Sequence, residues 1–535
     1  MKVWGSFFGL AVVLIVAAWW WLGRPVAMPV APLGPGEKLH CVSYVPFRGE
    51  QTPLDLSTHI PASQIEEDLT RLAPLTNCVR TYAVHLGLDH TVPIAQRQGL
   101  KVLLGIWLGP DPVFNQRQLE VAIDLANRYP DVVQAIVVGN EVLLRGELSP
   151  EALSNIIRKV KAAVKVPVTY ADVWEFWLRN RELASVVDFV TVHILPYWED
   201  FPIPASAAAD HVASIEHLVA QAFPGKDILV GEFGWPSFGR MRDGALPSPV
   251  NQASSMQEVL ARAKQDGFRV NLIEAFDQPW KRALEGTVGG HWGLLFGSSR
   301  EPKFAWGQPV SNHPGWIWQA LAGVLLAAAV FGIAWRTGGP PEKVPVQLRV
   351  GVLVNAAGPG ILIGWAVANA PLESFGVGGW ARSLAMLAVA LVAPMAATAA
   401  VLQRNPVPGF AKILGRSTER PTDFSGLFLG TGLILLTILA IGTALGLVFD
   451  PRYKDFPFVP LTAGVIPYAV LTLFAGWPER GSERRAELVA AIMLACSAIY
   501  IVINESFANW QAVWLGGVLL ILAAVLAPVR GARSS

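Results

Sequence analysis

Two hydrophobic patterns divide this chain of 535 residues. Within residues 36–305, short apolar runs alternate with stretches whose apolar positions recur at helical spacing. From Trp316 onward, and between Trp4 and Leu22, the apolar runs are long enough to cross a bilayer. We therefore expect an N-terminal transmembrane anchor and linker over 1–35, a globular α/β domain over 36–305, and an all-α polytopic domain of about seven transmembrane helices over 306–535.

The short runs in the globular segment are almost continuously apolar, as parallel strands buried on both faces are. They are Leu39–Tyr44, Cys78–Tyr82, Lys101–Trp107, Ala135–Val138, Val166–Tyr170, Phe189–His193, Ile228–Gly231 and Val270–Ala275. Eight such strands, each followed by a helix, predict a (β/α)8 TIM barrel. A doubly wound open sheet is the alternative, and the lack of a glycine-rich phosphate loop after the first strand disfavours it.

Two predicted helix starts carry capping signals. Ser149 before Pro150 is typical of an N-cap followed by a proline in the first turn. Ser63 with Glu66 predicts a capping box. Both signals place a helix in the segment that follows a predicted strand.

The apolar segments and the charges between them predict a membrane topology. The expected spans are Trp4–Leu22, Trp316–Trp335, Val350–Ala370, Trp380–Leu402, Gly426–Phe449, Val459–Trp477, Leu488–Asn504 and Gln511–Pro528. The first is an anchor or a cleaved signal peptide, and its long apolar core without a clear cleavage site favours the anchor. Lys and Arg gather in alternate loops, which predicts cytoplasmic chain ends and a globular domain on the periplasmic side of a cell inner membrane.

Composition limits the classes of partner and cofactor. Hydrophobic residues make up 52% and charged residues 16%, which is too apolar for an ordinary soluble protein. The net charge of +1 gives no reason to expect nucleic acid as a partner. We see no cluster with metal-ligand spacing, so we expect neither a metal nor a cofactor. Cys41 and Cys78 fall on predicted neighbouring strands, where they either form a bridge or remain buried thiols.

The ends of the predicted strands supply the candidate chemistry, because barrels of this kind carry function at the carboxyl ends of their strands. Glu141 follows the fourth strand and Glu232 the seventh, so the two carboxylates can face each other across the mouth. Breaking a glycosidic bond requires such a pair. The other candidates at strand ends are Arg80, Tyr82, Asn140, His193, Tyr197, Trp235, Asp277, Trp280 and Lys281.

The segments VVGNEV around Glu141 and GEFGWPS around Glu232 make the globular domain resemble glycoside hydrolase family 17. The segments VRTY, LLGIW, FDQPWK and HWG support this resemblance, and the last two are closer to microbial members, which suggests a membrane-bound bacterial one. The resemblance implies a retaining β-1,3-glucanase or glucanosyltransferase, with Glu141 as general acid/base and Glu232 as nucleophile. Family members often carry a glutamate where Gly289 stands, so its role is absent here or has moved to Glu285.

These roles carry expectations about the surroundings of the pair. The acid should have a raised pKa while the nucleophile stays ionised, with Arg80 or His193 holding Glu232 in that state. We expect Asn140 to bond the sugar 2-hydroxyl. The flat aromatic faces of Trp174, Trp177, Trp198 and Trp280 are candidate sugar platforms.

An enzyme held in a lipid bilayer gains little from releasing soluble products. We therefore expect remodelling of a β-glucan by transglycosylation, with hydrolysis as a side or main reaction and a separate glucan synthase as partner. The alternative is a non-catalytic glucan-binding or export subunit. The motifs leave the product linkage and the endo or exo mode open.

Overall fold

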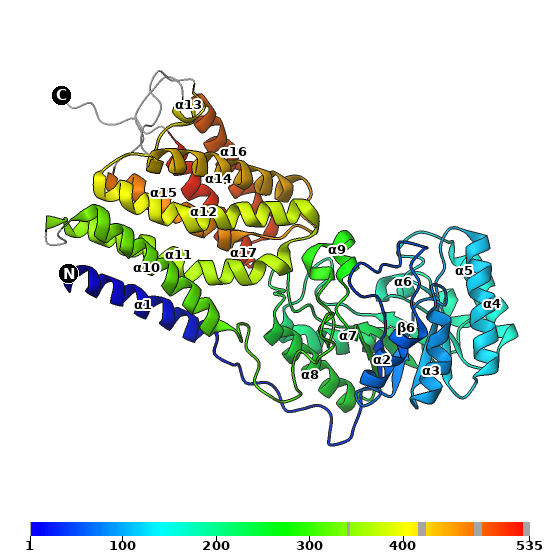
Figure 1. The fold of residues 1–535 in the computed structure, drawn as a ribbon. Coiled ribbons are helices and arrows are strands. Elements are labelled where there is room, and N and C mark those ends of the chain that lie inside the picture. The colour runs from blue at the N-terminus through cyan, green and yellow to red at the C-terminus, as the bar shows by residue number, and fades with distance from the viewer. Residues whose placement is uncertain (1, 340–342, 416–423, 476–483, 528–535) are drawn as a thin grey trace. The chain divides into compact units, whose positions relative to one another are not determined.

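The computed structural model describes residues 2–339, 343–415, 424–475 and 484–527. They form two compact units: a barrel unit, Val26–Val310, and a helical unit, which joins Met1–Pro25 to Ser311–Ser535 (Figure 1). The barrel unit includes residues 26–35 and 306–310, outside the predicted globular domain. Its two ends are joined where the backbones of Val26 and Val310 exchange hydrogen bonds of 2.8 and 3.0 Å.

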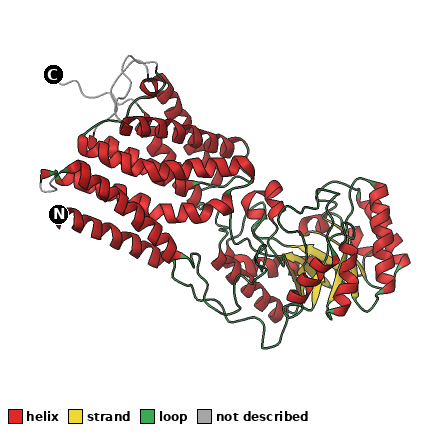
Figure 2. Ribbon diagram, in the orientation of Figure 1, coloured by secondary structure: helices red, strands yellow, loops and turns green. Residues whose placement is uncertain are grey.

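Eight parallel strands close into a barrel in sequence order, so the predicted (β/α)8 fold is confirmed. The strands are β1 Cys41–Ser43, β2 Cys78–Arg80, β3 Lys101–Ile106, β4 Val133–Asn140, β5 Val168–Val173, β6 Val190–His193, β7 Ile228–Phe233 and β8 Arg269–Leu272. All eight overlap the predicted strands. Figure 2 shows them in yellow, surrounded by the helices of the same unit.

The helices of the barrel unit follow the strands. They are α2 Ala62–Leu72, α3 Thr91–Arg97, α4 Pro112–Arg128, α5 Pro150–Ala163, α6 Trp174–Arg179, α7 Ala208–Ala222, α8 Pro249–Asp266 and α9 Arg282–Gly289, with short 3₁₀ turns η1 Leu88–His90, η2 Arg181–Ser185, η3 Ala205–Ala207 and η4 Pro279–Lys281. The Ser149 cap is confirmed, because its side chain accepts a hydrogen bond from the backbone N–H of Ala152. The Ser63 cap is wrong, because α2 already begins at Ala62 and Pro61 takes the cap position without a side-chain bond.

Small apolar side chains form a cluster on the barrel strands: Cys41, Cys78, Leu103, Ala135, Val137, Ala171 and Leu229. Cys41 and Cys78 form a disulfide that joins β1 to β2, which settles the alternative left open by the sequence. Because side chains alternate between the two faces of a strand, Arg80 lies on the same face as Cys78, one step nearer the carboxyl end. The disulfide therefore lies beneath the polar residues of the barrel mouth.

The helical unit contains α1 Lys2–Leu22, α10 Trp316–Gly338, α11 Val346–Glu373, α12 Gly376–Gln403, α13 Phe410–Ile413, α14 Phe424–Phe449, α15 Phe458–Ala475, α16 Arg485–Glu505 and α17 Trp510–Leu526. Within the described residues, seven of these helices are long and apolar enough to cross a membrane. The eighth predicted span, α17, is apolar but has only 17 residues. Helix α1 buries Trp4, Ala11, Ile15 and Trp19 in one core with the C-terminal helices.

Candidate active site

Glu232 lies at the end of β7 at the centre of a buried hydrogen-bond network. Arg80 on β2 donates to Glu232 Oε1 at 2.9 Å, to the carbonyl of Gly231 at 2.7 Å and to Asn140 Oδ1 at 2.5 Å. The Tyr82 hydroxyl donates to the same Glu232 oxygen at 2.8 Å. Since Glu232 is only 4% exposed, these donors take the place of water around its carboxyl group.

Glu141 stands on a sharp turn at the end of β4. Its φ of 54° is left-handed, and Gly139 just before it has a φ of 88°. Its backbone N–H donates to the carbonyl of Ala171 on β5 at 2.8 Å. Arg145 donates to the carbonyl of Asn140 and, at 2.9 Å, to that of Leu108. The turn that carries Glu141 is therefore tied to both neighbouring strand ends.

His193, fully buried at the end of β6, lies between the two glutamates. Its Nδ1 is 2.9 Å from Glu141 Oε1, and its Nε2 is 3.3 Å from an Arg80 nitrogen. Because arginine can only donate, a ring with a single proton accepts at Nε2 and donates from Nδ1 to Glu141. The same Nε2 is 3.4 Å from Glu232 Oε1. A single imidazole thus bridges the two predicted catalytic carboxylates.

The structure brings the candidate carboxylates close together. One oxygen each of Glu141 and Glu232 and one nitrogen of His193 all lie within 4.8 Å of one another. Two carboxylates and an imidazole are a set that binds divalent metals. The fit to a cation is poor, however, because the Arg80 guanidinium already lies 2.9 Å from Glu232 and would repel it. The spacing suits a pair of carboxyl groups acting on one bond.

The pKa of Glu141 differs from the expectation for a general acid. Burial raises this pKa, but the hydrogen bond and charge of His193 and the charges of Arg145 and Arg80 outweigh burial, so the pKa lies below its ordinary value. The site therefore favours Glu141 as a carboxylate paired with His193. The sequence could not show this, because the pairing depends on where β6 places the imidazole.

Asn140 and Tyr82 both face the candidate pair. Asn140 uses its Oδ1 to accept from Arg80, which leaves its amide Nδ2 for a ligand. Burial and the neighbouring Glu232 carboxylate raise the pKa of Tyr82 well above the ordinary value. The Tyr82 hydroxyl therefore stays protonated and donates its hydrogen to Glu232.

The end of β8 carries an ion pair that the sequence showed only in part. Lys281 is paired through Nζ with both carboxylate oxygens of Glu274, at 2.9 and 3.0 Å. Burial raises the pKa of Glu274 to about 7 despite this lysine. Trp280 is half-buried beside Lys281 and donates to Gln278 at 2.9 Å. Sequence reasoning named Lys281 and Trp280 and missed Glu274, whose one signal was a charge inside an apolar strand.

Tyr197 and Trp235, predicted to bind substrate, are fully buried among the loops above the strands. The Tyr197 hydroxyl donates to the carbonyl of Arg240 at 2.8 Å, and the Trp235 indole to that of Leu246 at 3.0 Å. Both side chains therefore contribute to the packing of the loops. Neither ring presents a face to solvent.

Asp277, another residue predicted to bind substrate, is 6% exposed. It pairs with Lys303 at 2.6 Å and accepts from the Gly293 N–H at 2.9 Å. Burial raises its pKa, but the charge of Lys303 and the hydrogen bond of His291 outweigh burial and lower it. Asp277 thus fastens the loop that follows β8.

The tryptophans proposed as sugar platforms separate into two groups. Trp177 is fully buried and donates to the carbonyl of Thr191 at 2.8 Å, so it belongs to the core. Trp174 is partly exposed, and its indole donates to Glu199 at 3.2 Å. Trp198 stacks on Trp292 with an interplanar angle of 14°. Only the partly exposed rings can offer a face to a sugar.

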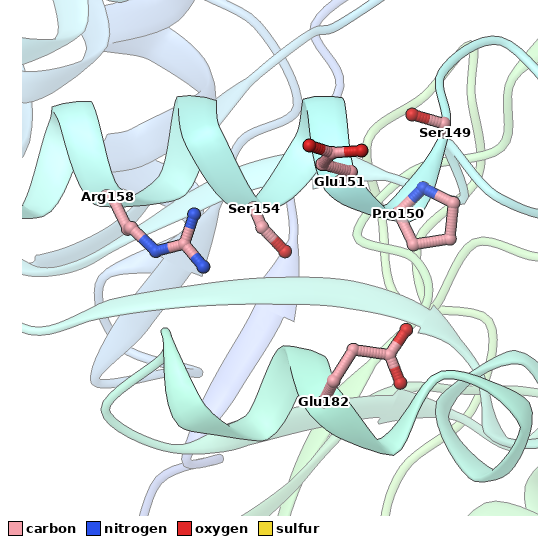
Figure 3. A pocket seen from close by; sticks show the side chains of 6 residues that line it. All are labelled: Ser149, Pro150, Glu151, Ser154, Arg158 and Glu182. Atoms are coloured by element: carbon pink, nitrogen blue, oxygen red, sulfur yellow. The ribbon is translucent and has the colours of Figure 1, made fainter.

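A surface pocket lies apart from these strand ends, between the start of α5 and η2 (Figure 3). It is lined by Ser149, Pro150, Glu151, Ser154, Arg158 and Glu182. Its charged groups lie on helices of the outer layer, and none of the strand-end candidates lines it. We therefore place the candidate active site at the barrel mouth and assign no ligand to this pocket.

The barrel unit is similar to several known proteins. The family model described as the BtgE/BtgC glycoside hydrolase domain matches residues 41–293. A glucan 1,3-β-glucosidase of Schizosaccharomyces pombe is 31% identical over 256 residues, which cover 44% of this chain and 78% of the relative. A glucan 1,3-β-glucosidase of Candida albicans is 28% identical over 43% of this chain and 82% of the relative.

A solved structure of a glycoside hydrolase family 17 β-1,3-glucanosyltransferase from Rhizomucor miehei is also similar. It is 28% identical, covers 49% of this chain and 95% of its own chain, and superposes with a TM-score of 0.44. All of these similarities fall on about half of this chain.

Proposed function

This chain belongs to glycoside hydrolase family 17, and from that premise we propose that Glu141 and Glu232 are the catalytic pair of a retaining enzyme acting on β-1,3-glucan. The observation that carries the proposal is the spacing of the pair. Oxygens of the two carboxylates lie within 4.8 Å of each other. Retaining enzymes hold their carboxyl groups about 5–5.5 Å apart, whereas inverting enzymes need about 6.5–9.5 Å to admit a water.

The surroundings of each glutamate favour one role. Glu232 is buried and held in place by hydrogen bonds from Arg80 and Tyr82, so we assign it as the nucleophile that attacks the anomeric carbon. Glu141 is 24% exposed at its side chain and can reach a leaving oxygen at the mouth. Protonated Glu141 gives its proton to that oxygen as the glycosidic bond breaks and the Glu232–sugar bond forms.

The second half of the reaction decides what the enzyme makes. Glu141, now a carboxylate, removes a proton from water or from a sugar hydroxyl as that oxygen displaces Glu232 from the anomeric carbon. Water gives hydrolysis, and a second glucan gives transglycosylation. We propose transfer as the main outcome, because a chain fixed in a membrane acts on glucan that stays beside it.

Two features support placing the barrel outside the cytoplasm. The disulfide between Cys41 and Cys78 belongs to oxidising compartments rather than to a reducing cytosol. The loops rich in Lys and Arg lie on the opposite side of the predicted spans. We propose that the helical unit holds the barrel at the outer face of an inner membrane, beside a separate glucan synthase.

Incubation of the full-length protein in detergent with laminari-oligosaccharides of one length tests both parts of the proposal. We expect products longer than the substrate as well as shorter ones, with the β configuration retained. Glu232→Ala should abolish turnover while binding persists. Shorter products alone at every substrate concentration would exclude transfer, and turnover by Glu232→Ala would exclude the catalytic pair.

A further inference from the structure

Helix α9 brings a third glutamate, Glu285, toward the catalytic pair. Burial raises the pKa of its carboxyl group against the opposing charge of Lys281, and the charges of Glu141 and Glu232 add to the increase. Among the described residues, no side chain or backbone group bonds to this carboxyl. Lys281 does not need it as a counter-ion, since both oxygens of Glu274 already lie within 3.0 Å of the lysine.

The Glu285 side chain occupies space that is free because position 289 is a glycine. A Cβ built on Gly289 would lie 2.5 Å from the Cβ of Glu285 and 2.8 Å from its Oε2. Distances under 3.0 Å to a Cβ are essentially never seen. Positions 285 and 289 therefore compete for one space, and in this chain the carboxyl from position 285 fills it.

An unbonded carboxyl group beside two other carboxylates is unfavourable unless a ligand compensates for it. Unpaired charges in a partly buried site are typical of functional positions. Sugar hydroxyls are the donors that the proposed substrate would bring to this place. A carboxylate can accept from two of them, and such charge-assisted bonds are stronger than bonds between neutral groups.

We propose that Glu285 is a substrate-binding residue that accepts hydrogen bonds from hydroxyls of the glucosyl unit next to the scissile bond, in the space that Gly289 leaves open. This inference rests on the proposed function, because it assigns the substrate to the same site. It makes positions 285 and 289 alternative attachment points for one carboxylate.

The binding role is measured in the inactive background Glu141→Gln, with the full-length protein in detergent and laminaritriose as the probe. Adding Glu285→Ala should weaken laminaritriose binding about 10- to 100-fold, as expected for the loss of a hydrogen bond to a charged group. Glu151→Gln, which removes an exposed carboxylate on α5, is the matched control and should leave binding unchanged. Binding within about twofold of the parent variant after Glu285→Ala overturns the proposal.

Moving the carboxylate tests the shared space directly. In the otherwise unchanged enzyme, Glu285→Gly should lower kcat/KM on laminari-oligosaccharides, and adding Gly289→Glu should restore at least part of that loss. The single substitution Gly289→Glu should lower activity, because the two side chains then collide. If the double variant fails to fold, the laminaritriose measurement alone decides.

The inference and the proposed function fail in different ways. Full activity of Glu232→Ala would refute the proposed catalytic pair, independently of the result for Glu285. If the Glu141 and Glu232 variants behave as proposed but Glu285→Ala leaves laminaritriose binding unchanged, only the inference about Glu285 is refuted. A loss of activity matched by a lower unfolding temperature, with binding unchanged, would assign Glu285 to structure and overturn it as well.

Discussion

Replacing Cys41 and Cys78 together by alanine should destabilise the barrel unit far more than replacing Cys496. The bridge joins positions separated by 37 residues, and closing a loop of that size in the unfolded chain corresponds to about 4 kcal/mol of stability. Unfolding temperatures of large domains change by about 2–4 °C per kcal/mol, so we expect a decrease of about 8–16 °C. Truncation of two side chains inside a filled barrel adds to this loss.

The assay is residual turnover of laminari-oligosaccharides after stepwise heating of the full-length protein in detergent, since it follows the barrel unit alone. Cys496→Ala serves as the control because that cysteine is free and exposed. Reductant added under mild denaturation should lower the inactivation temperature of the wild type toward that of the double variant. If the double variant is inactivated within about 2 °C of the wild type, the disulfide does not stabilise the barrel.

Three further predictions concern charges around the mouth. Arg80→Met should lower the free energy of unfolding by about 3–5 kcal/mol, because it leaves the Glu232 carboxyl buried without its partner. Arg80→Lys should not restore kcat. An unchanged free energy of unfolding in Arg80→Met would contradict the hydrogen-bond network around Glu232. Asp277→Asn should lower thermal stability at neutral pH. Because the folded pKa of Asp277 is lowered, the gap to wild type should narrow as pH falls below about 4, and a constant gap would argue against its ion pair with Lys303. The lowered pKa of Glu141 predicts that kcat/KM falls as pH rises toward neutral, since the protonated acid is lost. A plateau of kcat/KM that extends above about pH 7 would refute this prediction.

The sequence predicted the barrel well because parallel strands buried on both faces leave a simple signal. Glu141 and Glu232 were placed correctly at strand ends for the same reason, since each follows a continuous apolar run. Glu274 was missed because it lies inside such a run, where a lysine seven positions later compensates for the burial of its carboxyl group. A local pattern carries no information about that partner.

Loop residues were harder to place than strand residues. Tyr197 and Trp235 have the composition of a sugar-binding surface, yet the loops fold over them and satisfy their polar atoms with backbone carbonyls. Arg145 looks like any polar loop residue until its guanidinium is seen above the ring of Trp107, 4.3 Å from the ring centre. These contacts join segments whose relative positions only the closed barrel defines.

The core shared by α1 and the C-terminal helices sets an order of assembly. Trp19 donates to the carbonyl of Ile361 at 3.1 Å, so α1 packs against partners that are synthesised after the whole barrel. At about 5–20 residues per second, α1 waits roughly 15–60 s for α10 to appear. During that interval the apolar surface of α1 lacks its partners in the helical unit, and cleavage behind α1 would remove a helix that this core contains.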